Sequence, residues 1–544
     1  MDGDTAERIK AARTTCEAWL GAEPDADIRI ELQSLLDGDS RNLTDRFEGE
    51  LTFGTAGLRA PIGAGPRRMN RLVVRRAAAG VVDALVAADP LSLERGLLIG
   101  YDARFKSRDF AFDTARVAAA RGMRARVTAV PVPTPVLAWN ITRLGVAAGI
   151  MVTASHNPAA DNGYKVYLGT GAQIVPPWDA DIAARISALD PVGIELAEVS
   201  DDLIEVLGDD VVDTYLGSLS DAGGGRPGVR IAYTALHGVG GSVAQRAFVQ
   251  AGFTDVTVVD AQQDPDPTFP TVAFPNPEEP GAMDLVLATA QRIDADIALA
   301  HDPDADRLGV AVPTVVGAAS GPRWRLLSGD EIGWLLAEHI LRNSNGDDRL
   351  LVTTVVSSSL LGKMAAAAGV HFAETYTGFK WIADAVVHRP DLHLVFAYEQ
   401  ALGYLVRDRP LDKDGISAAL VMAELATELK AAGRSFDDQL DMIAERFGRH
   451  ITAEAGVRME PTEAIAAVDR LRRNPPSEIG GRRVLEVQDF PEAMLLRIWV
   501  EGNNDSGRLR LQVRPSGTEP KIKVYGEGVG EDPRSLVQSL TTLL

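Results

Sequence analysis

The sequence predicts an α/β protein: three similar α/β domains with mixed sheets and a C-terminal α+β domain, arranged around a central cleft. Its 544 residues are too many for one hydrophobic core and correspond to three or four domains of roughly 150 residues each. Apolar runs of strand length alternate with Ala-rich stretches of helical period, which is typical of α/β units. From Gly448 onward, the runs alternate apolar and polar residues, as antiparallel strands do.

Three successive segments repeat one pattern: an apolar run that ends in a polar loop, a helical stretch, and a second such run. The runs occupy residues 96–104 and 149–158, 229–241 and 296–307, and 349–359 and 392–404. Their strands are continuous in Val, Ile and Leu, which predicts sheets covered by helices on both faces. Functional loops of α/β sheets follow the carboxyl ends of the strands, so we expect these loops to share one cleft.

Changes in composition mark the domain boundaries. The Gly-rich stretch at 221–228, the segment LSGDEIG at 327–333 and the end of a helical pattern near Phe447 separate four parts of the chain. The predicted domains are therefore 1–220, 221–328, 329–447 and 448–544. Six prolines within 264–281 predict an irregular segment there.

Composition also excludes classes of function. The net charge of −21 argues against a nucleic-acid partner, because phosphate backbones need a basic surface, although local Arg and Lys can still bind a small anion. No apolar run approaches the ~18 residues of a membrane span, so we expect no membrane partner. The single cysteine, Cys16, fits a reducing compartment, and the acidic first residues lack a signal peptide's apolar core; we expect a cytoplasmic protein.

Three carboxylates, Asp302, Asp304 and Asp306, follow a predicted strand at alternate positions in DPDADR. An extended loop turns alternate side chains to one side, so this spacing predicts a site for Mg²⁺, which prefers oxygen ligands. An EF-hand is excluded because Arg307 stands where that loop requires Gly. An aspartyl-phosphate phosphatase is disfavoured because Asp306 stands where its motif requires Thr or Val. The alternative is a solvated acidic turn.

A second apolar run ends in TASHNP, which places the Ser155 hydroxyl beside the His156 imidazole. Adjacent residues of an extended chain point in opposite directions, so the pair is not by itself a catalytic triad. A serine near a Mg²⁺ loop can instead carry a phosphoryl group, and Lys165 in NGYK could then transfer a proton to or from a sugar oxygen. A simple turn is the alternative, and both interpretations stay open at this level.

A third motif, RPSGTEPK, combines Arg514 with two hydroxyls and a glycine, which predicts a phosphate cradle, with a plain hairpin turn as the alternative. Two further Gly-rich loops are weaker signals. FGTAGLR, which ends at Arg59, is not a P-loop, because no G-K-[ST] follows. LHGVGGSV begins like a dinucleotide loop, but Val243 stands where Gly or Ala is needed.

Together, the motifs GTAGLR, TASHNP with NGYK, DPDADR, TGFK with YEQALGY, and RPSGTEPKIKVY resemble those of the α-D-phosphohexomutases, the phosphoglucomutases and phosphomannomutases. They occur in this order from residue 54 to residue 525. The resemblance implies four domains around a cleft, with a C-terminal domain that closes over the substrate. It also implies a phosphoserine at Ser155 and a Mg²⁺ ion held by that phosphate and the three aspartates of DPDADR.

The resemblance further assigns roles to single residues. Proton transfer and charge stabilisation would fall to Arg59, His156, Lys165 and Lys380. Substrate binding would fall to Arg307, Thr377, Gly378 and Glu399, with Arg514, Ser516, Gly517 and Thr518 on the distal phosphate.

The implied reaction interconverts a hexose 1-phosphate and a hexose 6-phosphate, with glucose or mannose as the sugar, through a bisphosphorylated intermediate. A sugar bisphosphate of the glucose 1,6-bisphosphate type would be the activator; no oligomeric state is implied. The sugar loop has Gln400 where some relatives have a second acid, so a phosphopentomutase or a sugar-1,6-bisphosphate synthase is the alternative. A Mg²⁺-dependent sugar phosphatase and a non-catalytic sugar-phosphate sensor are more distant ones.

Overall fold

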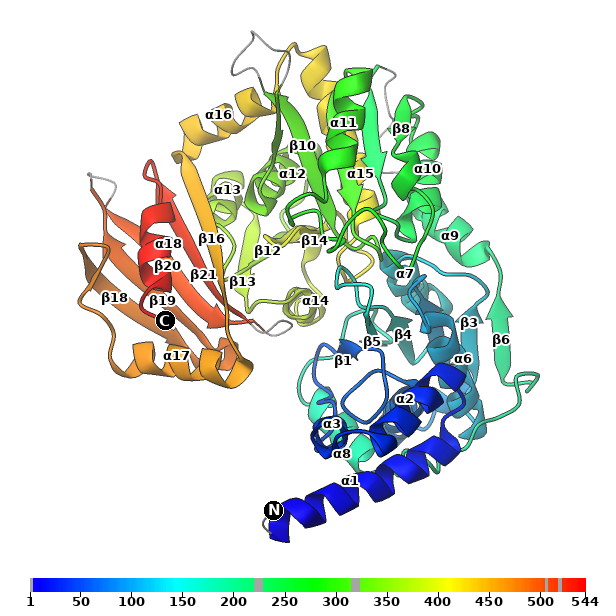
Figure 1. Cartoon of the computed structure of the whole chain (residues 1–544). Helices are drawn as coiled ribbons and strands as arrows, with labels where there is room; N and C mark the ends of the chain where they lie inside the picture. The colour runs from blue at the N-terminus through cyan, green and yellow to red at the C-terminus, as the bar shows by residue number, and fades with distance from the viewer. Residues whose placement is uncertain (1–2, 220–227, 315–322, 504–506, 517–520) are drawn as a thin grey trace. The chain divides into compact units, whose positions relative to one another are not determined.

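The computed structural model describes residues 3–219, 228–314, 323–503, 507–516 and 521–544 (Figure 1). It divides into two compact units, which are considered separately. The first unit comprises Met1–Leu326 and Gly403–Thr427, and the second comprises Leu327–Leu402 and Glu428–Leu544. None of the described helices has the length and apolar character needed to cross a membrane.

The first unit begins with three helices, drawn in blue in Figure 1, that have a small core of their own. They are α1 (Gly3–Ala22), α2 (Ala26–Asp37) and α3 (Ser40–Phe47). Trp19, Leu32 and Leu43 are buried between them, and Cys16 is fully buried in the same cluster. Asp39 caps α3 by accepting a hydrogen bond from the Arg41 amide.

The first sheet has six strands in the order β1-β5-β4-β2-β3-β6. Strands β4, β2, β3 and β6 run parallel, whereas β5 is antiparallel to both β1 and β4, so the sheet is mixed. The strands are β1 (Leu58–Pro61), β2 (Leu97–Tyr101), β3 (Ala125–Thr128), β4 (Ala148–Val152), β5 (Asp161–Leu168) and β6 (Ile204–Leu207). The helices are α4 (Arg71–Ala88), α5 (Ser92–Arg95), α6 (Ser107–Ala120), α7 (Thr134–Leu144), α8 (Trp178–Ala188) and α9 (Asp210–Ser218).

Burial explains why the central strands are continuous apolar runs in the sequence. Every residue of β2 and of β4 is buried, because helices cover both faces of the sheet. The polar residues of this segment follow the strand, and the chain that leaves β4 carries Ser155.

The second sheet has five strands in the order β11-β10-β9-β7-β8 and is also mixed. Strands β8, β7 and β9 are parallel, and β10 is antiparallel to β9 and β11. The strands are β7 (Ile231–Thr234), β8 (Val256–Val258), β9 (Ile297–His301), β10 (Leu308–Thr314) and β11 (Arg323–Leu326). The helical segments are α10 (Gly240–Gln250), η1 (Asp260–Gln262) and α11 (Asp284–Ile293). DPDADR is the tight connection from β9 to β10.

The segment Gly403–Thr427 belongs to the first unit. It contains β15 (Gly403–Leu405) and the start of α15 (Gly415–Ala431). Burial lowers the pKa of His301 to about 4, so the neutral ring accepts from the Tyr233 hydroxyl and donates from Nε2 to the Gly415 carbonyl at 2.9 Å. A Cβ at Gly415 would lie 2.4 Å from the Arg307 carbonyl oxygen, so glycine is required there.

The second unit contains a parallel arrangement of β12 (Arg349–Thr354) between β13 (His371–Thr375) and β14 (His393–Glu399). The accompanying helices are α12 (Gly329–Asn343), α13 (Leu360–Ala368), α14 (Phe379–Val387) and α16 (Phe436–Phe447). Capping boxes begin two of them: Ser328 with Glu331 at α12, and Ser435 with Asp438 at α16.

The second unit ends in an antiparallel six-stranded sheet with the order β16-β21-β20-β19-β18-β17. Its strands are β16 (His450–Arg458), β17 (Glu478–Ile479), β18 (Arg482–Phe490), β19 (Leu495–Glu501), β20 (Arg508–Pro515) and β21 (Lys521–Val529). Helices α17 (Pro461–Arg473) and α18 (Arg534–Thr541) pack on it, and η2 (Pro491–Ala493) precedes β19. The predicted fold class, α/β sheets followed by an α+β domain, is confirmed; the exact domain boundaries and the common cleft stay predictions.

Candidate active site

Ser155 lies directly after β4, where the chain turns out of the sheet. Its backbone is left-handed, with φ of 52°, a conformation that costs a non-glycine residue on the order of 1 kcal/mol or more. The Ser155 amide donates to Thr153 Oγ1 at 2.9 Å, which helps to hold this turn. The buried Ser155 Oγ donates to Asp302 Oδ2 at 2.8 Å and lies 3.2 Å from His156 Nδ1. The strand end therefore presents the hydroxyl to the DPDADR loop.

The three aspartates of DPDADR come together as the sequence predicts. Asp302, Asp304 and Asp306 are buried, and one ligand atom of each lies within 4.8 Å of the others. Ala305 has φ of 55°, and its amide donates to the Asp302 carbonyl at 2.9 Å, so the loop is a tight turn rather than an extended segment. The solvated-turn alternative is wrong, because none of the three carboxylates is exposed.

The Gly-rich segment LHGVGGSV supports this turn. A Cβ on Gly238 would lie 2.4 Å from Pro303 Cα, and a Cβ on Gly240 would lie 2.7 Å from Ala305 Cβ. Both glycines are therefore needed for close packing against DPDADR. This packing accounts for the glycines without a bound dinucleotide.

Lys165, on β5, supplies positive charge to the aspartates. Its Nζ donates to Asp304 Oδ2 at 2.8 Å and to Asp306 Oδ2 at 3.0 Å. Burial would lower the pKa of Lys165, but the two carboxylates outweigh it and raise the pKa above its usual value. In return the ammonium holds the pKa of Asp304 below its usual value, although burial opposes this. The two carboxylates therefore favour the charged, ammonium form of Lys165.

The carboxylates have further capacity for a cation. Burial and the neighbouring Asp304 and Asp306 raise the pKa of Asp302 well above its usual value. When all three carboxylates are ionised, their negative charge therefore exceeds the positive charge around them. Among the described residues, neither Asp304 Oδ1 nor Asp306 Oδ1 has a hydrogen-bond partner. Buried carboxylate oxygens without partners are costly unless an ion binds them, and oxygen-only ligand sets suit hard divalent cations. The residues present therefore fit a bound divalent metal ion.

Two predicted arginines contact the same loops. Arg59, on β1, donates from Nη1 to Asn157 Oδ1 at 3.1 Å in TASHNP. The Arg307 amide donates to Asp302 Oδ1 at 3.0 Å, and its Nη1 lies 3.7 Å from Glu278 Oε2. The first unit thus brings together eight predicted residues: Arg59, Ser155, His156, Lys165, Asp302, Asp304, Asp306 and Arg307.

Lys413 is a site residue to which the sequence analysis gives no role. Its Nζ lies 3.4 Å from Asp306 Oδ2 and 3.7 Å from Asp412 Oδ1. Asp412 in turn accepts from the Tyr167 hydroxyl at 2.7 Å and from Gln173 Nε2 at 2.8 Å. Burial would lower the pKa of Lys413, but Asp306 and Asp412 raise it. The available signal in the sequence was the scarcity of lysine: only 9 of the 55 Lys and Arg residues are lysines.

The second unit holds the residues predicted to bind the sugar. Gly378 has φ of 113° and lies at the start of α14, and its amide donates to Glu399 Oε1 at 3.1 Å. Thr377 and Lys380 flank it and are half-buried. The structure therefore joins the TGFK and YEQ motifs into one group, as expected if they bind one ligand.

The predicted phosphate cradle lies on the β20–β21 hairpin of the second unit. Arg514 is half-buried, with Nη1 3.5 Å from the Tyr525 hydroxyl, and the Ser516 amide donates to the Lys521 carbonyl at 2.8 Å. Gly517 and Thr518 lie outside the described residues.

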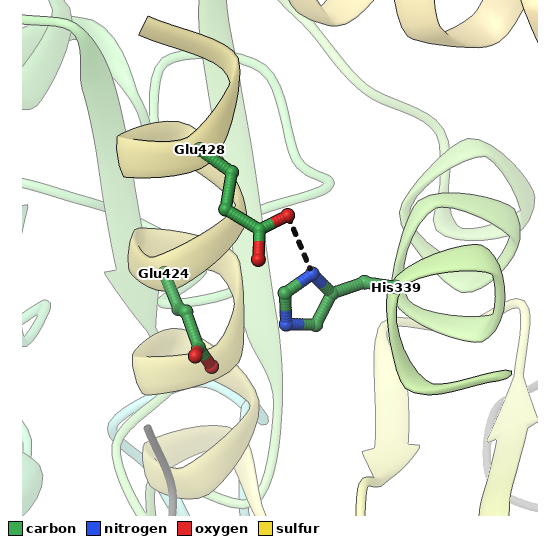
Figure 2. Close-up of side chains that lie close together, drawn as sticks. All are labelled: His339, Glu424 and Glu428. Carbon is green, nitrogen blue, oxygen red and sulfur yellow. Dashed lines mark ion pairs between the residues drawn. The ribbon is translucent and has the colours of Figure 1, made fainter. Parts of the chain in front are cut away.

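Away from these loops, Figure 2 shows His339 of α12 with Glu428 of α15, and it also labels Glu424, one turn earlier on α15. His339 Nδ1 lies 3.4 Å from Glu428 Oε2, and the Arg342 guanidinium lies 3.0 Å from the same oxygen. The Arg342 guanidinium pairs with Glu428 and lies beside His339, so the contact between His339 and Glu428 is explained without a bound ion.

A serine hydroxyl held against buried carboxylates, on a chain of α/β sheets, is an arrangement suited to phosphoryl transfer. Four family models match the chain. They describe the phosphoglucomutase/phosphomannomutase α/β/α domains I, II and III at residues 50–192, 215–317 and 328–447, and the C-terminal domain at 457–535. The chain therefore belongs to the phosphoglucomutase/phosphomannomutase family, in the α-D-phosphohexomutase superfamily, and is an intramolecular phosphotransferase.

Curated relatives carry names with different sugars. A probable phosphomannomutase of Haemophilus influenzae is 41% identical over 86% of this chain and 94% of its own length. A phosphopentomutase of Mus musculus is 35% identical over 94% of this chain and 90% of its own. A human glucose 1,6-bisphosphate synthase is 32% identical over 94% of this chain and 89% of its own length. These names agree on a phosphosugar and differ on which one.

The fold is similar to that of a phosphoglucomutase/phosphomannomutase family protein from Burkholderia thailandensis, with a TM-score of 0.69 and 21% identity. The match covers 91% of this chain and 96% of that one. A phosphoglucomutase from Paramecium, also called parafusin, has a TM-score of 0.65 at 18% identity. That match covers 91% of this chain and 95% of the other. At such identities these matches support the fold alone.

Proposed function

We propose that the protein interconverts a hexose 1-phosphate and a hexose 6-phosphate, with glucose or mannose as the sugar, and that Ser155 carries the transferred phosphoryl group. The observation that carries this proposal is the 2.8 Å hydrogen bond from Ser155 Oγ to Asp302, inside the buried carboxylate triad. A hydroxyl in that position is poised to exchange a phosphoryl group next to a bound cation.

Asp302, Asp304 and Asp306 would hold Mg²⁺, together with the phosphate of Ser155. When bound, the ion would neutralise charge on the phosphoryl oxygens. The chain's own cations, Lys165 and Lys413, already contact the same carboxylates and would keep the loop assembled.

The remaining residues have separable tasks in this scheme. Asp302 and His156 lie within hydrogen-bond reach of Ser155 Oγ, where its proton must leave when the hydroxyl accepts a phosphoryl group. The Lys165 ammonium would donate a proton to a departing sugar oxygen, and Arg59 would stabilise phosphoryl charge.

The second unit would bind the rest of the substrate. Glu399, fixed by the Gly378 amide, would accept hydrogen bonds from sugar hydroxyls, with Thr377 and Lys380 beside it. Arg514, together with Ser516, Gly517 and Thr518, would hold the distal phosphate. Exclusion of water from the occupied site would protect the phosphoserine from hydrolysis. In this proposal the enzyme is cytoplasmic and a sugar bisphosphate is its activator.

A pentose phosphate is the second candidate substrate, with sugar-1,6-bisphosphate synthesis as the related activity. It is favoured by the phosphopentomutase and bisphosphate synthase names of relatives that match 94% of this chain. Gln400 is buried, and its Oε1 accepts a hydrogen bond from Ser357 Oγ at 3.1 Å. This position therefore has a neutral amide, whereas a second acid here would bind a different set of sugar hydroxyls.

The test is a coupled assay with the 1-phosphates of glucose, mannose, ribose and deoxyribose, each with and without the matching bisphosphate. A hexose mutase gives a kcat/KM at least about tenfold higher for a hexose, roughly 1.4 kcal/mol of discrimination. The reverse order would replace the hexose by a pentose. Release of inorganic phosphate without sugar 6-phosphate or 5-phosphate would instead indicate a phosphatase, and no turnover of any substrate would refute the mutase.

A further inference from the structure

Arg104, in the loop after β2, contacts the backbone of the Ser155 loop at four places. Its Nη2 donates to the carbonyl oxygens of Ser155 and Asn157, both at 2.6 Å. Its Nη1 donates to the carbonyl oxygens of Pro158 at 2.7 Å and Asp161 at 3.2 Å. One planar guanidinium therefore gathers four carbonyl groups spread over seven residues of chain, from 155 to 161.

We propose that Arg104 is the positioning residue of the Ser155 loop: its guanidinium fixes the loop backbone so that Ser155 Oγ faces the aspartate triad. Among the described residues, the Arg104 guanidinium donates its hydrogen bonds to loop carbonyl oxygens and not to Oγ or the triad, so it acts through the backbone at and after Ser155. This inference rests on the proposed function of Ser155 and explains how the chain holds that residue in place.

The conformation of Ser155 is what requires such a partner. A left-handed φ of 52° is unfavourable for serine, and the Thr153 hydroxyl secures only the amide side of the residue. Arg104 secures its carbonyl group and, beyond it, those of Asn157, Pro158 and Asp161. If the carbonyl side relaxed, the side chain would rotate away from Asp302, because Cα and Oγ move with the backbone.

Arg104 is itself held from two directions. Its Nε lies 3.2 Å from Asp102 Oδ2, and its own amide donates to Asp102 Oδ1 at 3.0 Å. Its guanidinium lies over the ring of Phe269, 5.0 Å from the ring centroid, within cation–π range. Phe269 belongs to the proline-rich segment 264–281, which thereby acquires a role: it covers the arginine that holds the serine loop.

The matched control is Arg76 on α4. It is also buried, and it also binds backbone carbonyl groups, those of Ile186 at 2.7 Å and Ser187 at 3.3 Å, but these lie at the end of α8. Arg76 Nη1 also lies 2.7 Å from Glu50 Oε1. Arg76→Lys therefore disturbs a buried guanidinium that has two carbonyl contacts and one ion pair, and Arg104→Lys disturbs one that has four carbonyl contacts and one ion pair. They differ in whether the contacts belong to the Ser155 loop.

The experiment measures phosphoserine formation at Ser155 in a single turnover with a sugar 1,6-bisphosphate and Mg²⁺, by quenched-flow mass spectrometry, together with kcat and KM. Arg104→Lys is expected to slow phosphoserine formation and kcat about 100-fold, the cost of roughly 1 Å of misplacement, with KM within about twofold. Arg76→Lys is expected to leave all three within about twofold. Wild-type rates in Arg104→Lys, a rise in KM alone, or equal slowing in Arg76→Lys would each overturn the proposal.

If Arg104→Lys fails to fold by circular dichroism, Asp102→Asn replaces it. This variant keeps Arg104 but weakens the charge that orients it, so we expect about tenfold slower phosphoserine formation; an unchanged rate in the folded variant overturns the proposal. Absence of phosphoserine in the wild type would refute the proposed function itself, whereas phosphoserine formed equally fast by Arg104→Lys refutes only the role of Arg104.

Discussion

Ser155→Ala tests the chemistry at the scale of one residue. The substitution removes the oxygen proposed to carry the phosphoryl group, so we expect turnover to fall at least about 1,000-fold, as loss of a nucleophile does. Alanine needs the same left-handed backbone, so the thermal midpoint should change little. The measurements are the coupled assay and calorimetry, with buried Ser92→Ala as the control outside the site. Retained mutase activity in Ser155→Ala would disprove the phosphoserine route.

Lys165→Met tests whether the aspartate triad needs positive charge. The ammonium contacts Asp304 and Asp306, and its loss leaves buried carboxylates without a partner, which costs several kcal/mol. In the absence of divalent ions we expect the thermal midpoint of Lys165→Met to lie several degrees below that of the wild type. Added Mg²⁺ should raise the midpoint of the variant by more than it raises that of the wild type. Equal Mg²⁺ shifts in both proteins would contradict the idea that Mg²⁺ and the Lys165 ammonium neutralise the same carboxylates.

At the scale of elements, the positions of motifs at strand ends could be predicted from the sequence, because the residues that define each strand end directly precede the motif in the chain. The strand β4 has to end before Ser155, and DPDADR has to leave β9, so both loops follow from burial alone. The contacts of Arg104 and Lys413 could not be predicted, because they depend on which loops the sheets bring together. The same holds for the segment Gly403–Thr427, whose packing in the first unit is a matter of tertiary contacts and not of composition.

Glu527 on β21 joins the last sheet of the second unit to the start of α13. It accepts from Ser358 Oγ at 2.6 Å and His450 Nδ1 at 2.8 Å, and it pairs with Arg510 at 2.7 Å. Burial would raise the pKa of Glu527, but Arg510 and these hydrogen bonds lower it from 4.5 to about 2. A lowered pKa stabilises the folded state above pH 4.5, and this stability is lost as the pH falls from 4.5 toward 2.

Glu527→Gln should therefore destabilise the protein at pH 7 by about 3 kcal/mol, at roughly 1.4 kcal/mol per pKa unit. The difference from the wild type should shrink as the pH is lowered below 4.5. Urea unfolding midpoints between pH 7 and pH 3 provide the measurement. Glu454→Gln, which removes a more exposed pair with Lys523, is the control and should cost less than about 1 kcal/mol. A pH-independent deficit would argue that packing, and not charge, is what Glu527 contributes.

At the scale of the whole molecule, the predicted residues divide by task between the two units. The first unit has the serine, the aspartates and Lys165, which would serve the proposed transfer, whereas the second has Glu399, Arg514 and Ser516, which would serve substrate binding. Such a division predicts that binding and chemistry respond to different substitutions. Because the second unit's residues would touch phosphate and hydroxyl groups that do not react, their loss should act mainly on affinity.

Arg514→Ala tests this division. We expect KM for the sugar monophosphate to rise about 10- to 100-fold, the worth of one charge-assisted phosphate contact, while single-turnover phosphoserine chemistry at saturating bisphosphate changes less than about fivefold. Ser155→Ala should show the opposite: unchanged substrate affinity by calorimetric titration and no turnover. If Arg514→Ala instead lowered kcat with KM unchanged, the phosphate contact would be one made only in the transition state, and the two units would not divide the work in this way.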